Sequence, residues 1–199
     1  MNTPSAEALH ELLAHRAIEN VITRYCRAID RQDLELLQSV YHSDARDEHA
    51  SFNGSAQEFA VHVMEWLKDW FCTMHCVTHS NIEVHGDVAA AESYFYAHHA
   101  MRGDLPKIAS FFGGDYAAAC QKQGNLHGDH EFICGGRYID RFEKRNDEWR
   151  IANRTITVEW RHTRPATRIP ADASLAEISV PGKQDRSDPV YRYFDFSKG

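Results

Sequence analysis

The chain has 199 residues, which is the usual size of a single domain. Its 43% hydrophobic residues allow a sizeable buried core, and 29 acidic against 22 basic residues give a formal net charge of −7. This balance argues against binding to nucleic-acid phosphates or to an anionic membrane surface. No apolar run approaches the roughly 18–20 residues that span a bilayer, so no membrane association is expected.

The five cysteines are odd in number and form no paired CxxC framework. The N-terminus also lacks the basic start and apolar block of a signal peptide. The cysteine pattern is typical of reduced thiols in a cytosol, and the N-terminus gives no sign of secretion. The sequence therefore predicts a cytoplasmic protein.

Three helices are predicted in the first third of the chain. Ser5 can cap a long helix whose apolar residues follow the helical period as far as Ile29, where a polar run begins. Asp33 can cap a second helix from residue 34 to about 41. A third helix is expected to begin at Ser55, where Ser-Ala-Gln-Glu forms a capping box.

Strands are predicted in the rest of the domain. Residues 44–52 are extended in character but unusually polar, and the later candidates are rich in β-branched and aromatic residues: 73–85, 88–101, 130–144 and 148–162. Gly86-Asp87 and Asn146-Asp147 are expected to form tight turns. Residues 102–129 interrupt the strands as a Gly-rich insertion that is partly helical in pattern.

Helices followed by antiparallel strands predict an α+β fold, with the helices on one face of a curved sheet and a pocket between them. The expected domain covers residues 1–162. Residues 163–199 contain four prolines and little periodicity, which predicts an extended tail over this domain or a neighbouring subunit.

Four stretches resemble the SnoaL-like branch of the nuclear transport factor 2-like superfamily. They are Ile18-Glu19-Asn20 through Asp30, Met74-His75 through Asp87, Gly136 through Glu143 with Trp149-Arg150-Ile151, and Asp185-Arg186-Ser187-Asp188-Pro189. The resemblance implies a cone-shaped, strongly curved mixed sheet, as in a cystatin-like roll, with three N-terminal helices on its concave face.

The same resemblance implies the residues that carry the chemistry. Scytalone dehydratases, bile-acid 7α-dehydratases and hexachlorocyclohexane dehydrochlorinases have an Asp at the end of the first helix and a His on the strand after the third helix. Asp30 and His75 fall on these positions, and Tyr25 matches a tyrosine of the dehydratases. An Asp that accepts a hydrogen bond from a histidine fixes the ring's tautomer for general acid–base work. Alternatively, Asp30 is a helix-end residue paired with a nearby arginine, and Tyr25 is an ordinary core tyrosine.

Further substrate-binding candidates come from the strand pattern. His75 and His79 are expected to share one strand face, and on the next strand we expect the face of Phe95 and His99, rather than that of His98, to point inward. The 44–52 strand carries charge on both faces, which indicates a wet pocket and makes its inward residues Asp47 and His49 candidates. Arg154 on the last strand can bind an anionic or carbonyl group, or can pair with a strand neighbour.

The sequence thus predicts a lyase, of dehydratase or dehydrohalogenase type, that needs no cofactor and acts on a small hydrophobic oxygenated cyclic molecule. A ketosteroid-type isomerase, a polyketide-type cyclase and a non-catalytic ligand-binding protein are the alternatives. No metal is expected, because histidines four apart on a strand lie roughly 13 Å apart. A homo-oligomer, trimer or dimer, is expected by resemblance and because an antiparallel sheet often has a free face.

Overall fold

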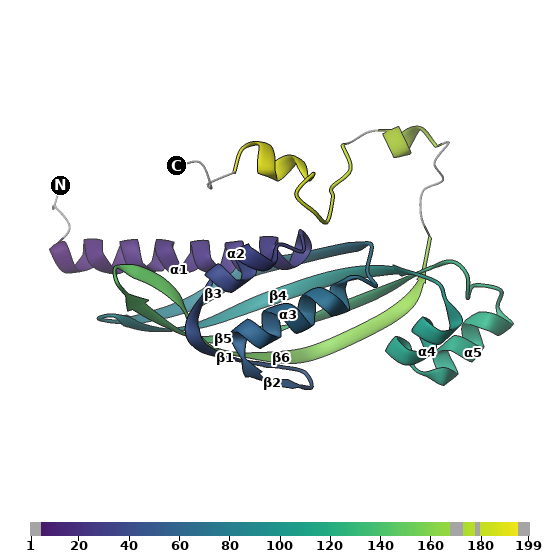
Figure 1. Ribbon diagram of the computed structural model, residues 1–199, viewed down its shortest axis with the longest axis horizontal. Coiled ribbons are helices and arrows are strands. Elements are labelled where there is room, and N and C mark those ends of the chain that lie inside the picture. The colour runs from purple at the N-terminus through teal and green to yellow at the C-terminus, as the bar shows by residue number, and fades with distance from the viewer. Residues whose placement is uncertain (1–4, 168–172, 178–179, 195–199) are drawn as a thin grey trace.

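A long first helix, α1 (Ala6–Asp30), lies along the sheet in the computed structural model, which describes residues 5–167, 173–177 and 180–194 (Figure 1). Ser5 caps it as predicted, since its side-chain oxygen accepts a hydrogen bond from the Ala8 backbone N–H at 3.1 Å. The buried residues of α1 follow the helical period and end with Asp30 itself.

The C-terminal end of α1 places Asp30. Gln32 adopts a left-handed conformation (φ 50°), and the backbone N–H groups of Gln32 and Asp33 donate to the carbonyls of Ile29 and Ala28. This pattern is a Schellman motif, which ends the helix at Asp30 with Arg31 as its C-cap. Asp33 then caps α2 (Leu34–Ser39) by accepting a hydrogen bond from the Leu36 N–H at 3.1 Å.

The segment after α2 differs from the sequence prediction. The second helix ends at Ser39 rather than near residue 41, and a single strand over 44–52 is wrong: β1 (Tyr41–His49) and β2 (Phe52–Ser55) form a hairpin that turns at Ala50 (φ 54°). Tyr41 starts β1 because it pairs with Ile151 and its ring is buried in the core, a tertiary preference that helical pattern cannot show. Ser55 caps α3 (Ala56–Leu67) as predicted.

Four long strands form most of the sheet: β3 (Cys72–His85), β4 (Val88–Arg102), β5 (Asp129–Arg145) and β6 (Glu148–Ala166). They meet in tight turns at Gly86-Asp87 and Asn146-Asp147, where three of the four residues have positive φ. The spatial order is β2-β1-β6-β5-β4-β3, with β1 parallel to β6 and every other pair antiparallel.

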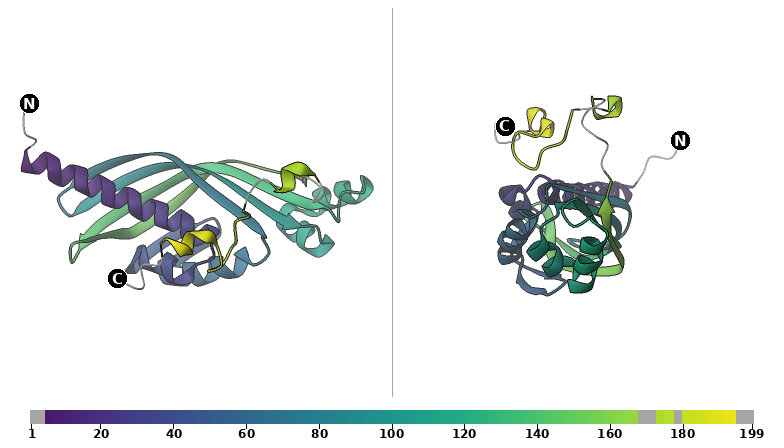
Figure 2. Two further views of the ribbon diagram at one scale, coloured as in Figure 1. Left: turned by 90° about the horizontal axis from the view of Figure 1, so that it is seen from above. Right: turned by 90° about the vertical axis from the view of Figure 1, so that its right-hand side faces the viewer.

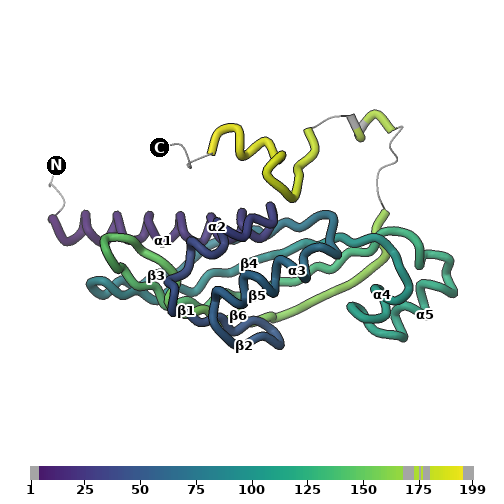
Figure 3. The backbone as a smooth tube through the Cα atoms, viewed as in Figure 1, coloured from purple at the N-terminus to yellow at the C-terminus, as the bar shows by residue number. Residues whose placement is uncertain are grey.

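The sheet curls around the helices, as Figures 2 and 3 show. α1 packs against β3 and β6, and α3 packs against β1, so the helices cover the concave face. The fold is therefore the predicted α+β arrangement, with a six-stranded, curved and mixed sheet that does not close. None of the helices in the described ranges combines the length and the apolar character that crossing a membrane requires.

The insertion between β4 and β5 forms two short helices, α4 (Leu105–Phe112) and α5 (Gly114–Lys122), at one end of the sheet (Figure 1). Phe111 packs against Trp66 and Trp70 with ring centroids 5.9 and 5.5 Å apart, and Phe112 lies 6.5 Å from Phe132. The insertion thus places aromatic side chains that pack against one end of the space between α3 and the sheet.

The tail begins later than predicted, because β6 continues to Ala166. Its described parts include two short 3-10 turns, Ser174–Glu177 and Pro189–Arg192. The second part returns to the end of α1: Arg31 forms an ion pair with Asp188 at 3.0 Å, and the Tyr191 hydroxyl donates to Asp33 at 2.7 Å. The remainder of the predicted tail lies outside the described residues.

Candidate active site

A cavity of about 280 Å³ lies between the concave face of the sheet and the helices α1 and α3. Its walls are mainly apolar and aromatic, as is usual for a small-molecule site. The polar side chains that line it include four histidines, and no aspartate or glutamate of the described residues lines it. These histidines are His49, His62, His75 and His99.

Asp30 and His75 are in direct contact at one wall of the cavity. The Asp30 Oδ1 atom lies 2.7 Å from the His75 ring Nδ1, and Oδ2 accepts a hydrogen bond from the His75 backbone N–H at 2.9 Å. His75 lines the cavity and Asp30 lies behind it, 7% exposed. A carboxylate at the C-terminal end of a helix faces the negative end of the helix dipole, so these two hydrogen bonds offset an unfavourable position.

The two bonds fix the chemistry of the His75 ring. A carboxylate can only accept, so Nδ1 carries a proton, and in the neutral ring the lone pair is therefore on Nε2. The hydrogen bond from the His75 backbone N–H ties β3 to the same Asp30 carboxylate. This bond restrains the position of the ring, and the bond to Nδ1 restrains its tautomer. In this tautomer the Nε2 atom is the ring nitrogen that can accept a proton.

His99 lies next to His75 on the inner face of β4, as the predicted strand register requires. The two rings are 5.1 Å apart and nearly perpendicular, and His99 also packs edge-on against Trp66 and Trp70. Burial, together with the neighbouring His75, lowers the pKa of His99 well below 6.5, so the ring is neutral near pH 7. Its Nδ1 atom is buried without a partner among the described residues.

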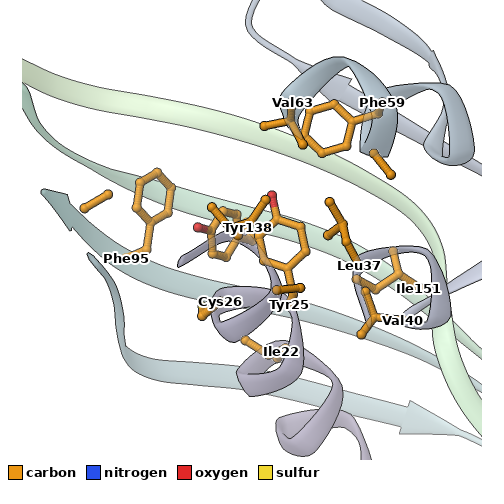
Figure 4. Packing of buried hydrophobic residues seen from close by; sticks show 14 of the residues in the cluster. Ile22, Tyr25, Cys26, Leu37, Val40, Phe59, Val63, Phe95, Tyr138 and Ile151 are labelled. Carbon is orange, nitrogen blue, oxygen red and sulfur yellow. The ribbon is translucent and has the colours of Figure 1, made fainter. Parts of the chain in front are cut away.

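Tyr25 and Tyr138 form the floor of the cavity, and Figure 4 shows them opposite Phe59 and Val63 of α3. Their rings meet edge to face with centroids 5.5 Å apart, and Phe95 stacks on Tyr138 at 4.5 Å. Burial raises the pKa of the Tyr25 phenol above its usual value near 10. Its hydroxyl therefore stays protonated and can donate a hydrogen bond to a ligand.

Arg154 lies beneath this floor rather than on it. Its guanidinium binds Asp140 through two hydrogen bonds of 2.7 Å, and both side chains are fully buried. The guanidinium also lies 4.1 Å from the Tyr25 ring centroid and 4.3 Å from that of Tyr138. Arg154 is not among the lining residues, so the ion pair with a strand neighbour is the interpretation that the structure supports.

Asp47 and His49 stand at the opposite wall, on β1. Asp47 is fully buried and accepts a 2.6 Å hydrogen bond from the Tyr41 hydroxyl, while His49 lines the cavity and stacks on Phe59. The His49 Nδ1 and Asp47 Oδ1 atoms are 4.0 Å apart, and each is buried without a partner in the described part of the chain. The His49 side chain as a whole is 34% exposed, but its Nδ1 is buried, and this burial lowers its pKa.

The stability of the fold should depend on the protonation of Asp47. Burial raises the pKa of Asp47 from 3.8 to about 6, so the folded state binds this proton more tightly than the unfolded state. The Asp47 carboxyl group lowers stability little below about pH 4, and its cost develops between pH 4 and pH 6, above which the folded state ionises as well. Asp47→Asn should therefore gain on the order of 2–3 kcal/mol of unfolding free energy relative to the unmodified chain between pH 4 and pH 7.5.

Urea unfolding of both proteins at the two pH values measures this gain. Asp44→Asn on the same strand is the control, because Arg145 lowers the pKa of Asp44 and its change should have the opposite sign. A difference for Asp47→Asn that does not vary with pH would show that the carboxyl titrates normally.

His79 lies outside the cavity, and the prediction that it shares the face of His75 is wrong. Val77 pairs with Phe95 but His79 pairs with Tyr94, so Thr78 is an extra residue in β3. This β-bulge reverses the alternation of side chains. His79 consequently stacks on Tyr94 with centroids 4.7 Å apart, on the outer face of the sheet.

Sequence reasoning missed three of the polar side chains that line the cavity, namely His62, Cys134 and Arg161. His62 stacks on Phe52 and interrupts the apolar face of α3, a signal that could have been read from the helical period. Cys134 and Arg161 gave no such signal, because their facing depends on strand register. No cluster of three or more His, Cys, Asp or Glu side chains that could hold a metal occurs in the described ranges.

Comparison with known proteins agrees with this architecture. The model of the SnoaL-like domain matches residues 10–155. A type 2 hexachlorocyclohexane dehydrochlorinase superposes with a TM-score of 0.63 at 15% identity, covering 83% of this chain and 99% of the other. A putative scytalone dehydratase from Novosphingobium aromaticivorans gives a TM-score of 0.58 at 18% identity, covering 80% and 91%.

A protein of unknown function with a cystatin-like fold, from Nostoc punctiforme, gives a TM-score of 0.52 at 17% identity and covers 79% of this chain and 96% of its own. The search of curated proteins found no match. At these identities the solved structures show a common fold, whereas the domain match extends over most of the chain. The chain belongs to the SnoaL-like family.

Proposed function

We propose that this protein is an acid–base lyase in which His75, oriented by Asp30, removes a proton from a carbon next to a carbonyl or an allylic position. The observation that carries the proposal is the double hydrogen bond of Asp30 to the ring and the backbone of His75. A histidine that served only to fill the core would not need a buried carboxylate to select its tautomer.

The proposed elimination balances without a further reactant. Nε2 of His75 takes the proton from carbon, the released electron pair forms a carbon–carbon double bond, and the bond to the leaving hydroxyl breaks. The imidazolium then returns its proton to the leaving oxygen, which departs as water. Asp30 stabilises the transient positive charge, and Tyr25 donates a hydrogen bond to the substrate carbonyl as negative charge develops there.

The shape of the cavity supports a small cyclic substrate. Its volume of about 280 Å³ and its aromatic walls suit one or two rings, and its polar groups lie at a few defined points. The names of two structural neighbours, a putative scytalone dehydratase and a hexachlorocyclohexane dehydrochlorinase, also describe eliminations, the second from a cyclohexane ring. An isomerase or a cyclase would begin with the same proton removal, and the identity of the product distinguishes them from a lyase.

The test follows proton removal directly. A panel of cyclic ketones and cyclic β-hydroxy ketones, with scytalone and hexachlorocyclohexane, is incubated with the protein in D₂O and followed by NMR. We expect exchange of the α-proton of the ketones and formation of a conjugated alkene from the hydroxy ketones. Both signals should disappear in His75→Ala.

His79→Ala is the matched control, because His79 is a histidine of the same strand that lies on the outer face. It should keep both signals. Exchange that persists in His75→Ala would remove His75 from the role of base. Binding of panel members without any exchange or alkene would favour the non-catalytic ligand-binding protein, and exchange without alkene formation would favour the isomerase or cyclase.

A further inference from the structure

Two consecutive glycines in β5 face an irregularity in β6. Gly136 pairs with Val158 and Gly135 pairs with Trp160, so Glu159 is an extra residue and β6 has a β-bulge there. A Cβ atom on Gly136 would lie 2.0 Å from the backbone oxygen of Thr157, and one on Gly135 would lie 2.6 Å from the Trp160 indole. Only glycines fit opposite this bulge.

The bulge turns Arg161 to the cavity side of β6, where its side chain lines the cavity and is also exposed to solvent. Ile156 and Val158 line the cavity, and regular alternation would place Trp160 next to them. With the extra residue, Trp160 instead covers Gly135 from the outer face, where it packs against the exposed Tyr96. Arg161 pairs with Cys134, and both side chains line the cavity.

Arg161 differs from the other arginines of these two strands in having no carboxylate partner. Six of them form an ion pair with an aspartate or glutamate: Arg137, Arg141, Arg145, Arg150, Arg154 and Arg164. Within the part of the chain that the structure describes, Arg161 forms no ion pair and no acidic residue lines the cavity. The cavity therefore presents one permanent positive charge that nothing in the described chain neutralises.

The position of Arg161 relative to His75 is set by the sheet. His75 pairs with Ala97, Ala97 with Cys134, and Cys134 with Arg161, so these residues form one row across four strands. All four line the cavity. Three strand spacings of about 4.8 Å place the two end Cα atoms roughly 14 Å apart along the sheet, and the concave curvature brings their side chains nearer.

We propose that the substrate carries a carboxylate that binds the Arg161 guanidinium, at the end of the cavity row opposite His75. A guanidinium holds a carboxylate through two parallel hydrogen bonds, and the overall charge of −7 means that an anion needs such a local attraction. The proposal rests on the proposed function only in placing the reacting carbon at His75. The substrate is thus a cyclic oxygenated carboxylic acid of one or two rings.

The test compares two probes that share a naphthalene ring, one with a charged carboxylate and the other with a neutral hydroxyl. Binding of 2-naphthoate and of neutral 2-naphthol is measured by isothermal titration calorimetry at pH 8. We expect the protein to bind the carboxylate at least about tenfold more tightly, the difference that a charge-assisted hydrogen-bond pair produces. Arg161→Gln should remove this preference and leave the affinity for 2-naphthol unchanged.

Arg164→Gln is the matched control, because Arg164 is an exposed arginine of β6 that pairs with Glu131 outside the cavity. It should bind both probes as the unmodified chain does. Equal affinity for the two probes, no binding of the carboxylate up to its solubility limit, or an equal loss in Arg164→Gln overturns the proposal. His75→Ala should keep the carboxylate preference, so failure of this proposal is distinguishable from failure of the lyase.

Discussion

Asp30→Asn is expected to lower the rate of α-proton exchange roughly 10²–10⁴-fold, nearly as much as loss of the His75 ring. The reason lies in the two hydrogen bonds that Asp30 accepts. The His75 backbone N–H is a fixed donor, so the single amide oxygen of the introduced asparagine must face it. The amide NH₂ then faces the ring Nδ1, which must become an acceptor. The proton moves to Nε2, and the base loses its lone pair toward the substrate.

The tautomer of His75 can be measured directly, which distinguishes a loss of ring orientation from a loss of folding. Two-dimensional ¹⁵N NMR of the histidine rings should show His75 protonated at Nδ1 in the unmodified protein and at Nε2 in Asp30→Asn. Asp33→Asn is the matched control, since Asp33 is equally buried at the same turn and an asparagine keeps its capping role. Asp30→Asn with an unchanged tautomer and full exchange would show that the carboxylate does not orient the base.

Arg154→Met should destabilise the fold by about 3–5 kcal/mol, the largest loss expected for a side chain that does not line the cavity. The Asp140 carboxylate would then be left buried without the guanidinium that holds both of its oxygens. The contacts of the guanidinium with the rings of Tyr25 and Tyr138, which support the floor of the cavity, would also be lost. Guanidinium chloride unfolding monitored by circular dichroism measures the change in free energy.

The double variant Arg154→Met with Asp140→Leu should recover much of this loss, because it leaves no uncompensated charge in the core. Arg137→Met is the matched control on the same pair of strands. Its partners Glu92 and Glu159 are partly exposed, and such pairs contribute less than about 1 kcal/mol. A double variant as unstable as Arg154→Met alone would mean that packing, not the unpaired carboxylate, determines the cost.

The comparison of sequence and structure is clearest in the strands of the cavity. The alternation that placed Phe95 and His99 inward on β4 was right, because the side chains of β4 keep their period over that region. The same reasoning failed for His79, since the bulge at Thr78 shifts the alternation of β3 by one residue. No particular residue type marks a β-bulge in the sequence. The alternation of side chains along a strand therefore cannot show where a bulge lies.

Burial distinguishes the polar residues that line the cavity from those that pair inside the core. Asp47, His49 and Arg154 were grouped from sequence as possible ligand-binding residues, but only His49 lines the cavity. The other two are fully buried and pair with Tyr41 and Asp140. Whether a charged side chain faces a cavity or a partner depends on which strand lies beside it, and β1 pairs with β6 across about a hundred residues of sequence.

The amino-acid sequence by itself determined the long capped helix that ends near Asp30, the tight turns of the hairpins and the α+β class, because caps, turns and periodicity act over a few residues. Only the tertiary structure decided that Asp30 meets His75 and that Arg161, rather than Arg154, reaches the cavity. The Asp30–His75 contact depends on the Schellman turn and on the packing of α1 against β3, and the facing of Arg161 depends on the β-bulge at Glu159. These features bring together residues far apart in the chain.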